Sequence, residues 1–331
     1  MKKSKISLYA GLLSILLIAG CSSDDSSGAG KESSGGDSGA YKIGVSQFVE
    51  HPSLDEATKG FKQALEDKGL EVEYDDQNAQ GDQNNTGPIS KNFVSHGVDL
   101  IFANATPSAQ AAVNATKDIP VIFTSVTDPV SAKLVASMET PEGNATGTSD
   151  ANPEAIPSTV AFIADELKGK KIGTIYNAGE QNSVVQVEQM KKEAKAAGVE
   201  VVEATVSTSA EVKQAAESLL GKADVFYIIT DNTVVSALES VVQVAYDKDI
   251  PLFVGELDSV ERGGFAAYGF NYYDIGYSAG EMAAAILEDG KEPGTIAVEY
   301  PKELKLVINQ KAAEEMGIEI KEEWKENAEL Q

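Results

Sequence analysis

Short apolar segments alternate with amphipathic stretches along most of the chain. Residues 42–45, 98–102 and 119–123 are apolar runs of strand length, and Phe61 and Leu65 recur at helical spacing between the first two runs. Strands that alternate with helices in this way indicate βαβ units, which form parallel sheets covered by helices on both faces. The pattern therefore predicts an α/β protein.

The same order of strands and helices occurs twice. The matching segments are residues 42–45 and 171–174 (KIGV and KIGT), 98–102 and 223–229, and 117–123 and 248–254 (KDIPVIF and KDIPLFV). The first helix of each half ends at a glycine, Gly69 or Gly198, which predicts a left-handed C-cap. The duplication predicts two doubly wound parallel-sheet lobes, joined by a hinge, with a ligand cleft between the carboxyl ends of their strands. One enlarged sheet and two unrelated Rossmann-like enzyme domains stay open as alternatives.

The repeat also predicts the domain boundaries. Lobe I is expected to comprise residues 41–150 plus about 265–290, and lobe II residues 151–262 plus about 295–331. The chain would then cross between the lobes near residue 150, at 260–264 and at 290–295. Gly263 and Gly264 would give the hinge its dihedral freedom. The neighbouring Arg262 is expected to pair across the hinge rather than to bind a ligand carboxylate.

The beginning of the chain differs from the rest. Three lysines precede an apolar run at residues 6–18, and the run leads to Cys21, the only cysteine, through Ile-Ala-Gly. This pattern predicts a lipoprotein signal peptide at residues 1–20, with lipidation of Cys21. The run is shorter than the roughly 20 residues that a membrane span needs. The Ser-, Gly- and Asp-rich residues 21–40 are then a disordered tether. We expect the protein to be lipid-anchored at the extracytoplasmic face of the membrane, most simply on a Gram-positive cell surface.

Composition narrows the range of partners. The formal net charge is -25, which argues against nucleic acid and against any membrane contact beyond the lipid anchor. Arg262 is the only arginine, and this disfavours phosphate-rich ligands. A single cysteine leaves no disulfide, so the fold depends on its apolar core.

Polar side chains follow the predicted strands, where the loops of a parallel sheet gather. Their hydroxyl, amide and carboxylate groups can hydrogen-bond a ligand without reacting with it. The predicted ligand site consists of Gln47, Phe48, Thr106, Ser108, Ser125, Asp150, Asn182, Ser183, Asp231, Asn232 and Glu256. Thr106 to Ser108 also begin a predicted helix, whose N-terminal N–H groups favour a carboxylate. Ordinary N-capping is the competing interpretation for each single residue.

Motifs of catalysis are missing from the sequence. It contains no H-E-x-x-H, no G-x-S-x-G and no complete Rossmann glycine fingerprint. His51 and His96 are the only histidines. His96 ends a predicted helix, where a positive charge is favourable. His51 lies in a cleft loop, where a bond to a neighbouring acid is favoured over the alternative, a hydrogen bond to the ligand. We therefore predict no catalytic residue, no metal site and no cofactor.

Several longer segments carry a family resemblance. Residues 44–55, 103–110 and 123–129 resemble the ABC-transporter substrate-binding proteins of the tryptophan-binding type, and the resemblance continues through residues 147–150, 176–183, 230–232 and 305–309. It implies a type I periplasmic-binding-protein fold. It also implies capture of an aromatic or other apolar amino acid, and delivery to a separately encoded ABC permease and ATPase. We further expect the receptor to be a monomer.

Such a ligand would need partners for its charges and for its ring. Asp150 and Asp231 are the expected partners of the ligand ammonium, and Thr106 and Ser125 the expected donors to its carboxylate. Phe48, Phe265 and Tyr268 lie where their rings can stack on a ligand ring. Core or hinge packing is the competing interpretation, and for Phe265 it has equal weight. A nucleoside- or sugar-binding receptor on the same fold, and a ligand sensor for a membrane signalling partner, are the alternative functions.

Overall fold

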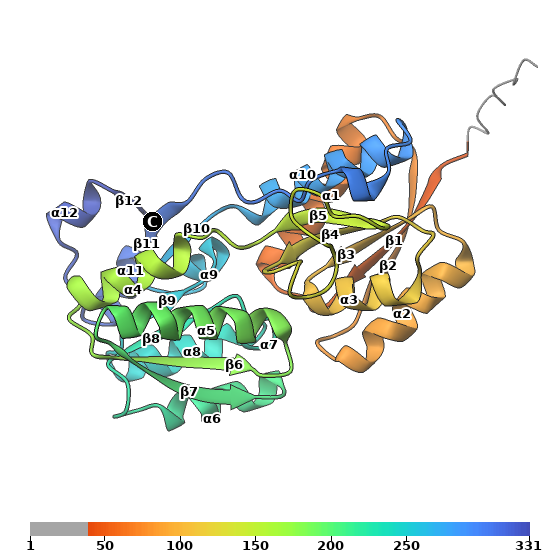
Figure 1. Cartoon of the computed structure of the whole chain (residues 1–331). Helices are drawn as coiled ribbons and strands as arrows, with labels where there is room; N and C mark the ends of the chain where they lie inside the picture. The colour runs from red at the N-terminus through yellow and green to blue at the C-terminus, as the bar shows by residue number, and fades with distance from the viewer. Residues whose placement is uncertain (1–38) are drawn as a thin grey trace, which may run out of the picture. The chain divides into compact units, whose positions relative to one another are not determined.

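The computed structural model describes residues 39–331, so the predicted signal peptide and the lipidation site Cys21 lie outside the described residues. These residues contain two sheets, each covered by helices, and the chain runs between them (Figure 1). We call the part around the five-stranded sheet lobe I and the part around the seven-stranded sheet lobe II. No helix of residues 39–331 combines the length and apolarity needed to cross a membrane.

Lobe I has a fully parallel sheet in the order β2-β1-β3-β4-β5. Its strands are β1 (Tyr41–Gln47), β2 (Val72–Asn78), β3 (Leu100–Asn104), β4 (Val121–Val126) and β5 (Ala145–Ser149). Its helices are α1 (Pro52–Asp67), α2 (Gln83–His96), α3 (Thr106–Ala115) and α10 (Tyr272–Leu287). Leu100 and Phe102 pack towards α1 and α10, while Ile101 and Ala103 pack towards α2 and α3. The alternation along β3 thus sorts the core into two layers.

Lobe II has the strand order β12-β11-β10-β9-β8-β6-β7, and all pairs except β10–β11 are parallel. Its strands are β6 (Lys171–Asn177), β7 (Glu200–Val206), β8 (Val225–Ile228), β9 (Leu252–Val254), β10 (Ala266–Gly269), β11 (Lys305–Ile308) and β12 (Ala328–Leu330). Its helices are α4 (Ala155–Asp165), α5 (Gln181–Ala196), α6 (Val212–Ser218), α7 (Asn232–Val235), α8 (Leu238–Asp247), α9 (Leu257–Glu261), α11 (Gln310–Glu315) and α12 (Glu322–Lys325). The 3-10 turn η1 (Ser209–Glu211) also belongs to lobe II, whereas η2 (Pro293–Thr295) lies beside β5 of lobe I.

The predicted duplication is confirmed by the sheet orders. The series β2-β1-β3-β4-β5 of lobe I corresponds, strand for strand, to β7-β6-β8-β9-β10 of lobe II. The two predicted C-cap glycines are also confirmed, since Gly69 and Gly198 have φ of 79° and 73° in the left-handed region. The fold is therefore the predicted α/β pair of doubly wound lobes.

The chain crosses between the lobes at residues 150–154, 270–271 and 300–304. The sequence pattern predicts the second crossing at residues 260–264, but β10 pairs with both β9 and β11 and so stays in lobe II. The third crossing also comes later than predicted. Ile296 bonds to Thr146 of β5 through its carbonyl, and Glu299 forms a bridge with Thr148, which holds this segment on lobe I.

Phe265, expected near the cleft, lies instead in the core of lobe II. Its ring is 5.4 Å from that of Phe253 and 6.2 Å from that of Trp324, and Phe162 lies among the same rings. Trp324 is buried against Phe162 at 4.8 Å and donates its indole N–H to the Glu166 carboxylate at 2.9 Å. This aromatic cluster joins α12 and α4 to the sheet, so Phe265 has a packing role.

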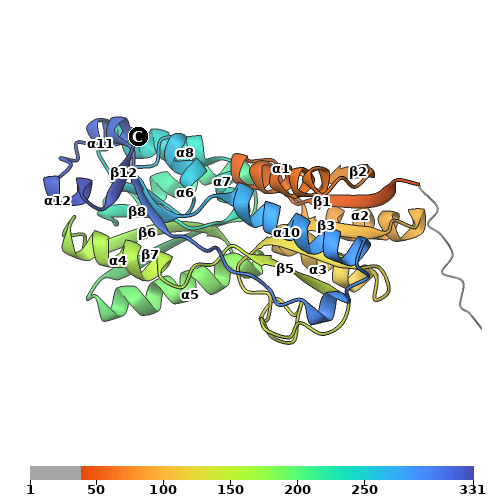
Figure 2. The same cartoon turned by 90° about the horizontal axis from the view of Figure 1, so that it is seen from above.

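Helices α1 and α10 lie side by side on one face of the lobe I sheet (Figures 1 and 2). Glycines allow their backbones to approach closely. A Cβ at Gly276 would lie 1.9 Å from the Ala57 carbonyl oxygen, and one at Gly60 would lie 2.1 Å from that of Tyr273. Because α10 directly follows the second crossing, this contact fixes the end of the hinge on lobe I.

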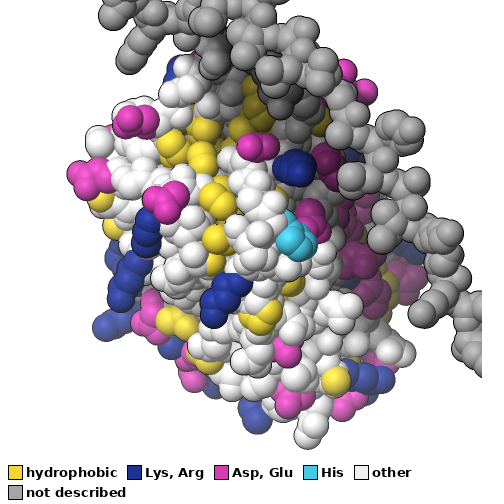
Figure 3. Space-filling view, turned by 90° about the vertical axis from the view of Figure 1, so that its right-hand side faces the viewer, with side chains coloured by type: hydrophobic (Ala, Val, Ile, Leu, Met, Phe, Trp, Pro, Cys, Tyr) yellow, Lys and Arg dark blue, Asp and Glu magenta, His cyan; other side chains and the backbone are white. Residues whose placement is uncertain are grey.

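Acidic and basic side chains are dispersed over the end of lobe I that faces away from lobe II. Figure 3 shows lysine side chains distributed among acids on this face, without a large basic patch there.

Candidate functional site

The carboxyl ends of the two sheets face each other and are linked by hydrogen bonds between the lobes. These bonds run from Gln186 to Thr127 (3.3 Å), from Gln181 to Ser131 (2.7 Å), from Gln83 to the Gly179 carbonyl (2.8 Å) and from Ser53 to Glu256 (2.7 Å). In an open parallel sheet this edge is where ligands bind. The interlobe region is therefore the candidate ligand site.

Buried polar atoms without a hydrogen-bond partner gather at this edge. Among residues 39–331 they include the side-chain oxygens of Thr106, Ser108 and Ser125, the Asn182 amide oxygen and both ring nitrogens of His51. His51 follows β1, Thr106 and Ser108 follow β3, Asn182 follows β6, and Ser125 lies next to the last residue of β4. Because buried polar groups are almost always paired in folded proteins, such a set marks a place built for an external partner. Thr106, Ser108, Ser125 and Asn182 were all predicted from the sequence.

Two of the connecting residues are held in an unusual backbone conformation. Ala105 has φ of 83° and Ser125 has φ of 56°, and both are buried. Ser125 also lies where the register between β4 and β5 shifts. Positive φ costs a residue with a side chain about 1 kcal/mol or more and persists mainly where surrounding structure imposes it, often at binding sites. The two unusual conformations lie where β3 leads into α3 and near the end of β4.

Helix α3 begins directly after Ala105 with no side-chain cap. An alanine cannot accept hydrogen bonds from the first turn as Ser, Thr or Asp would. The N-terminal N–H groups and the positive end of the helix dipole therefore stay available beside the Thr106 and Ser108 hydroxyls. This end of α3 is suited to a carboxylate.

Asp150 lies at the first crossing with an almost completely buried side chain. Its two carboxylate oxygens accept from the Thr127 hydroxyl at 2.9 Å and the Tyr272 hydroxyl at 3.0 Å. Burial raises the pKa of Asp150 to about 6, despite these two hydrogen bonds. No cation pairs with it among the residues that the structure describes. A buried, unpaired carboxylate of this kind is suited to an ammonium group. The contribution of Tyr272 was missed, because nothing in the sequence distinguishes it from its neighbour Tyr273.

Glu256, at the N-terminal end of α9, is a second buried acid. One of its oxygens accepts from Ser53 of lobe I at 2.7 Å and from Ser259 at 3.1 Å. Burial raises the pKa of Glu256 to about 7, with help from the charges of Asp258 and Asp150. The bond to Ser53 makes Glu256 a connection between the lobes.

Replacing Glu256 by glutamine should therefore change how stability depends on pH. The raised pKa means that wild-type folding stability, present at low pH, is lost as the pH rises from about 4.5 through about 7. Glutamine keeps an oxygen for both serines and has no proton to lose. The free energy of unfolding of Glu256→Gln minus that of the wild type should therefore increase by about 3 kcal/mol from pH 5 to pH 8.

Chemical denaturation of both ligand-free proteins at pH 5, 6, 7 and 8 would measure this gain. The matched control is Glu217→Gln, at an exposed position of α6, for which the difference from wild type should stay constant. A constant difference for Glu256→Gln would contradict the assignment.

Asp231 has its oxygens occupied by the protein. It caps α7 through the Val234 N–H at 2.8 Å, and it accepts from the Asn177 N–H and the Ser183 hydroxyl, both at 2.7 Å. Burial and the nearby Glu180 charge raise its pKa. The structure thus places Asp231 and Ser183 in a scaffold that orients α5 and α7, in place of the free carboxylate expected for an ammonium partner.

Asn232 and Glu180 belong to the same scaffold. The fully buried Glu180 carboxylate accepts from the Asn232 amide at 2.5 Å and from the Thr233 hydroxyl at 2.7 Å. The Asn182 amide nitrogen also points to Glu180, at 3.4 Å. This leaves the Asn182 oxygen as the free group of the cluster.

Gln47 and Phe48 support the site from the lobe I side. The Gln47 amide donates to Asp55 at 2.6 Å and accepts from Thr58 at 2.7 Å, so its polar atoms are already paired. Phe48 is fully buried in a small cluster with Leu54 and Ala105. Phe48 therefore lies beside the start of α3.

His51 differs from the expectation of a bond to a neighbouring acid, because neither ring nitrogen has a partner among the described residues.

Arg262 was expected to pair across the hinge. It forms instead a two-point contact with Glu239, at 2.8 and 2.9 Å, inside lobe II.

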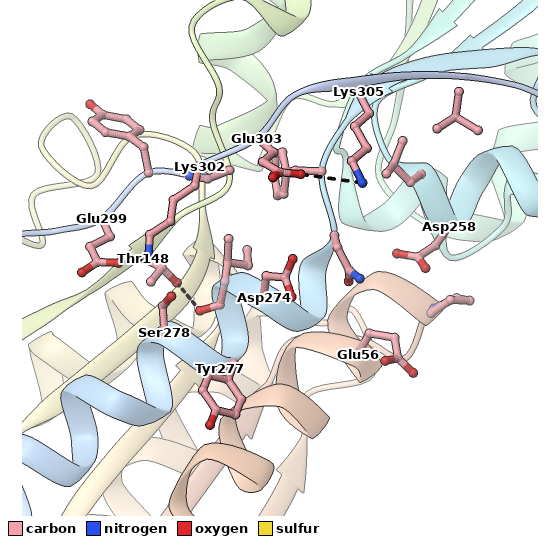
Figure 4. A pocket seen from close by; sticks show the side chains of 18 of the residues that line it. Glu56, Thr148, Asp258, Asp274, Tyr277, Ser278, Glu299, Lys302, Glu303 and Lys305 are labelled. Carbon is pink, nitrogen blue, oxygen red and sulfur yellow. Dashed lines mark hydrogen bonds and ion pairs between the residues drawn. The ribbon is translucent and has the colours of Figure 1, made fainter. Parts of the chain in front are cut away.

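A separate cavity of about 980 Å³ lies beside the crossings, between α1, α10 and residues 299–305 (Figure 4). Its lining side chains include the acids Glu56, Asp258 and Asp274, and Lys302 and Lys305 beside Glu299 and Glu303. The unpartnered buried atoms described above belong to other residues. Within residues 39–331 no three His, Cys, Asp or Glu side chains form a group that could hold a metal ion.

Comparisons with known proteins agree on one family. A family model described as "ABC transporter substrate binding protein" matches residues 42–330. The tyrosine-binding protein of Clostridioides difficile is 48% identical over 315 residues, which cover 93% of this chain and 90% of that protein. The structure of an ABC domain in complex with L-Trp from Streptococcus pneumonia has a TM-score of 0.84 at 36% identity, covering 88% of this chain and 100% of that chain. The ligand-free, open structure of a substrate-binding protein with adhesive properties from Clostridium difficile has a TM-score of 0.65 at 41% identity, with coverage of 88% and 99%.

Proposed function

Since the chain belongs to the family of ABC transporter substrate-binding proteins, we propose that it captures an aromatic L-amino acid, tyrosine or tryptophan, between its lobes for an ABC importer. The proposal rests on two kinds of unpaired group, one anionic and one donating, at the carboxyl ends of the strands. A buried carboxylate, Asp150, has no cation, and the start of α3 offers donors without an anion. An amino acid supplies both charges.

The recognition of the ligand backbone follows from these groups. The ammonium binds Asp150, whose hydrogen bonds from Thr127 and Tyr272 hold it in place. The carboxylate lies at the N-terminal end of α3, where the hydroxyls of Thr106, Ser108 and Ser125 donate to it. Each contact gives a partner to a polar group whose burial alone costs free energy. A zwitterion supplies both partners, so it is preferred over ligands that carry one charge or none.

The lobe arrangement supports a closed, ligand-competent state. The L-Trp complex matches this chain better, at a TM-score of 0.84, than the open structure, at 0.65, although the latter has the higher sequence identity. Sequence divergence therefore does not account for the difference. Closure would seal the ligand through bonds between the lobes such as Gln186 to Thr127 and Ser53 to Glu256.

The predicted anchor completes the proposal. Lipidation of Cys21 would keep the receptor at the extracytoplasmic face, next to a permease and ATPase encoded separately. We propose that it acts as a monomer that delivers its ligand to this permease, without catalysing any reaction itself.

Titration calorimetry with tyrosine, tryptophan, phenylalanine, leucine and glutamate tests the proposal, on protein freed of copurified ligand by unfolding and refolding. We expect the tightest binding for tyrosine or tryptophan. Glutamate should bind at least about 100-fold more weakly, because its side-chain charge would be buried without a partner. Tight binding of glutamate, or of no amino acid, would overturn the proposal. A sugar and a nucleoside belong in the same screen, since they represent the alternative ligand classes.

A further inference from the structure

We propose that His51 hydrogen-bonds the polar atom at the tip of the ligand ring, so that the receptor selects tyrosine over phenylalanine. This inference rests on the proposed function, because it assigns the ring end of an aromatic amino acid whose backbone end binds Asp150 and α3. His51 is the buried imidazole of the interlobe region, and it takes no part in the proposed recognition of the ligand backbone.

The position of His51 is fixed from both sides. The residue lies between β1 and α1, and Pro52 begins the helix directly after it. Ser53, two residues on, bonds across the interlobe region to Glu256 at 2.7 Å. The side chain is only 4% exposed, yet both ring nitrogens lack a partner within the described chain. A buried imidazole held this firmly, with no partner of its own, points to a ligand atom.

The protonation state of His51 defines which ligand group it suits. Burial, and then the positive charge of Arg262 on α9, lower the pKa of His51 to about 3. The Asn232 side chain on α7 lies close enough to oppose this shift, but its contact with the imidazole lacks hydrogen-bond geometry. The imidazole is therefore neutral, with one donor and one acceptor nitrogen. A phenol hydroxyl also donates and accepts. A carboxylate or an ammonium could use just one of these two capacities.

The strand order separates His51 from the groups that bind the ligand backbone. His51 follows β1 and Asp150 follows β5, with β3 and β4 between them. Three steps of about 4.8 Å place the two loops about 14 Å apart along the sheet edge. The start of α3 follows β3, and Ser125 lies near the end of β4. A ligand that lies along this edge has its ammonium near β5, its carboxylate in the middle and its ring tip near β1.

The test compares tyrosine with phenylalanine, which differ by the hydroxyl alone. Wild type should bind tyrosine about 10- to 100-fold more tightly, because phenylalanine leaves the buried imidazole unpaired. In His51→Leu this ratio should fall to about 1, through weaker tyrosine binding. His51→Gln, which can still donate and accept, should keep part of the preference. His96→Leu, at an exposed histidine, is the matched control and should keep the wild-type ratio.

Calorimetry gives both affinities for each protein, and thermal unfolding shows that each variant is folded. A ratio near 1 in wild type, or an unchanged ratio in His51→Leu, would overturn the inference. So would an equal loss for both ligands in His51→Leu and His51→Gln, because it would place His51 on the shared backbone. These results would leave the proposed function standing, whereas wild type that binds no aromatic amino acid would remove both.

Discussion

Replacing Asp150 by asparagine should weaken binding of the aromatic amino acid about 100-fold or more, while making the ligand-free protein more stable. The variant keeps the shape of the side chain, and an amide can still bond to the hydroxyls of Thr127 and Tyr272. What it removes is the negative charge. Loss of a buried, hydrogen-bonded charge partner usually costs 2 to 5 kcal/mol or more of binding free energy, about 30-fold to several thousand-fold.

The gain in stability follows from the pKa of the same carboxyl. Burial raises it to about 6 in the folded protein, so the folded state holds a proton that the unfolded state releases, and stability is lost as the pH rises from about 4 through 6. At pH 7 the ionised, unpaired Asp150 costs about 2 to 3 kcal/mol, which asparagine avoids. The ligand-free variant should therefore melt several degrees higher at pH 7, and the gain should shrink at pH 5.

Calorimetry with tyrosine and thermal unfolding at both pH values measure the two effects. Asp118→Asn, at an exposed position of lobe I, should leave both unchanged. If Asp150→Asn bound ligand within threefold of wild type, the ammonium would have to bind elsewhere, with Glu256 as the nearest buried alternative. A variant that lost both binding and stability would instead give Asp150 a structural role.

Gly276→Ala should strongly destabilise lobe I. Its Cβ would meet the Ala57 carbonyl oxygen at 1.9 Å, and backbone cannot move aside as a flexible side chain can. Helices α1 and α10 would have to separate, at a cost of about 3 kcal/mol. Because α10 begins with Tyr272, which bonds to Asp150, we also expect weaker ligand binding.

Thermal unfolding should show a melting temperature lower by about 6 to 10 °C. The matched control is Gly87→Ala in the interior of α2, where a Cβ would meet no atom within 4 Å. That change should stabilise the protein by about 0.5 to 1 kcal/mol, since alanine favours helix. Equal effects of the two substitutions would show that close helix packing is unimportant.

The internal repeat predicted most of the fold, because strand patterns and conserved spacing within one chain depend on local sequence. The crossings could not be found in the same way. Gly263 and Gly264 look like hinge residues, yet a Cβ at Gly264 would lie 2.7 Å from the Val254 side chain, so this glycine serves close packing in lobe II. The antiparallel pairing of β10 with β11 joins segments about 40 residues apart, which no local pattern reveals.

Position in the sequence predicted which strand ends carry the candidate site residues. It did not predict which of their side chains are already hydrogen-bonded within the protein. Thr106 and Ser125 lie as predicted at strand ends with unpartnered hydroxyls. Asp231 follows a strand in the same way, yet its oxygens cap α7 and bind β6. Whether an acid is free or occupied depends partly on distant donors, since Asn177 and Ser183 lie 54 and 48 residues from Asp231. The role of these residues in binding remains a prediction.

The buried cluster around Trp324 gives the molecule a built-in optical probe. It is the only tryptophan of the chain, and it lies in α12, at the end of lobe II away from lobe I (Figure 1). Fluorescence excited beyond the absorption of tyrosine therefore reports on lobe II alone, whereas circular dichroism reports on both lobes. Comparing the two signals during denaturation reveals whether the lobes melt as one cooperative unit or separately, without any added label.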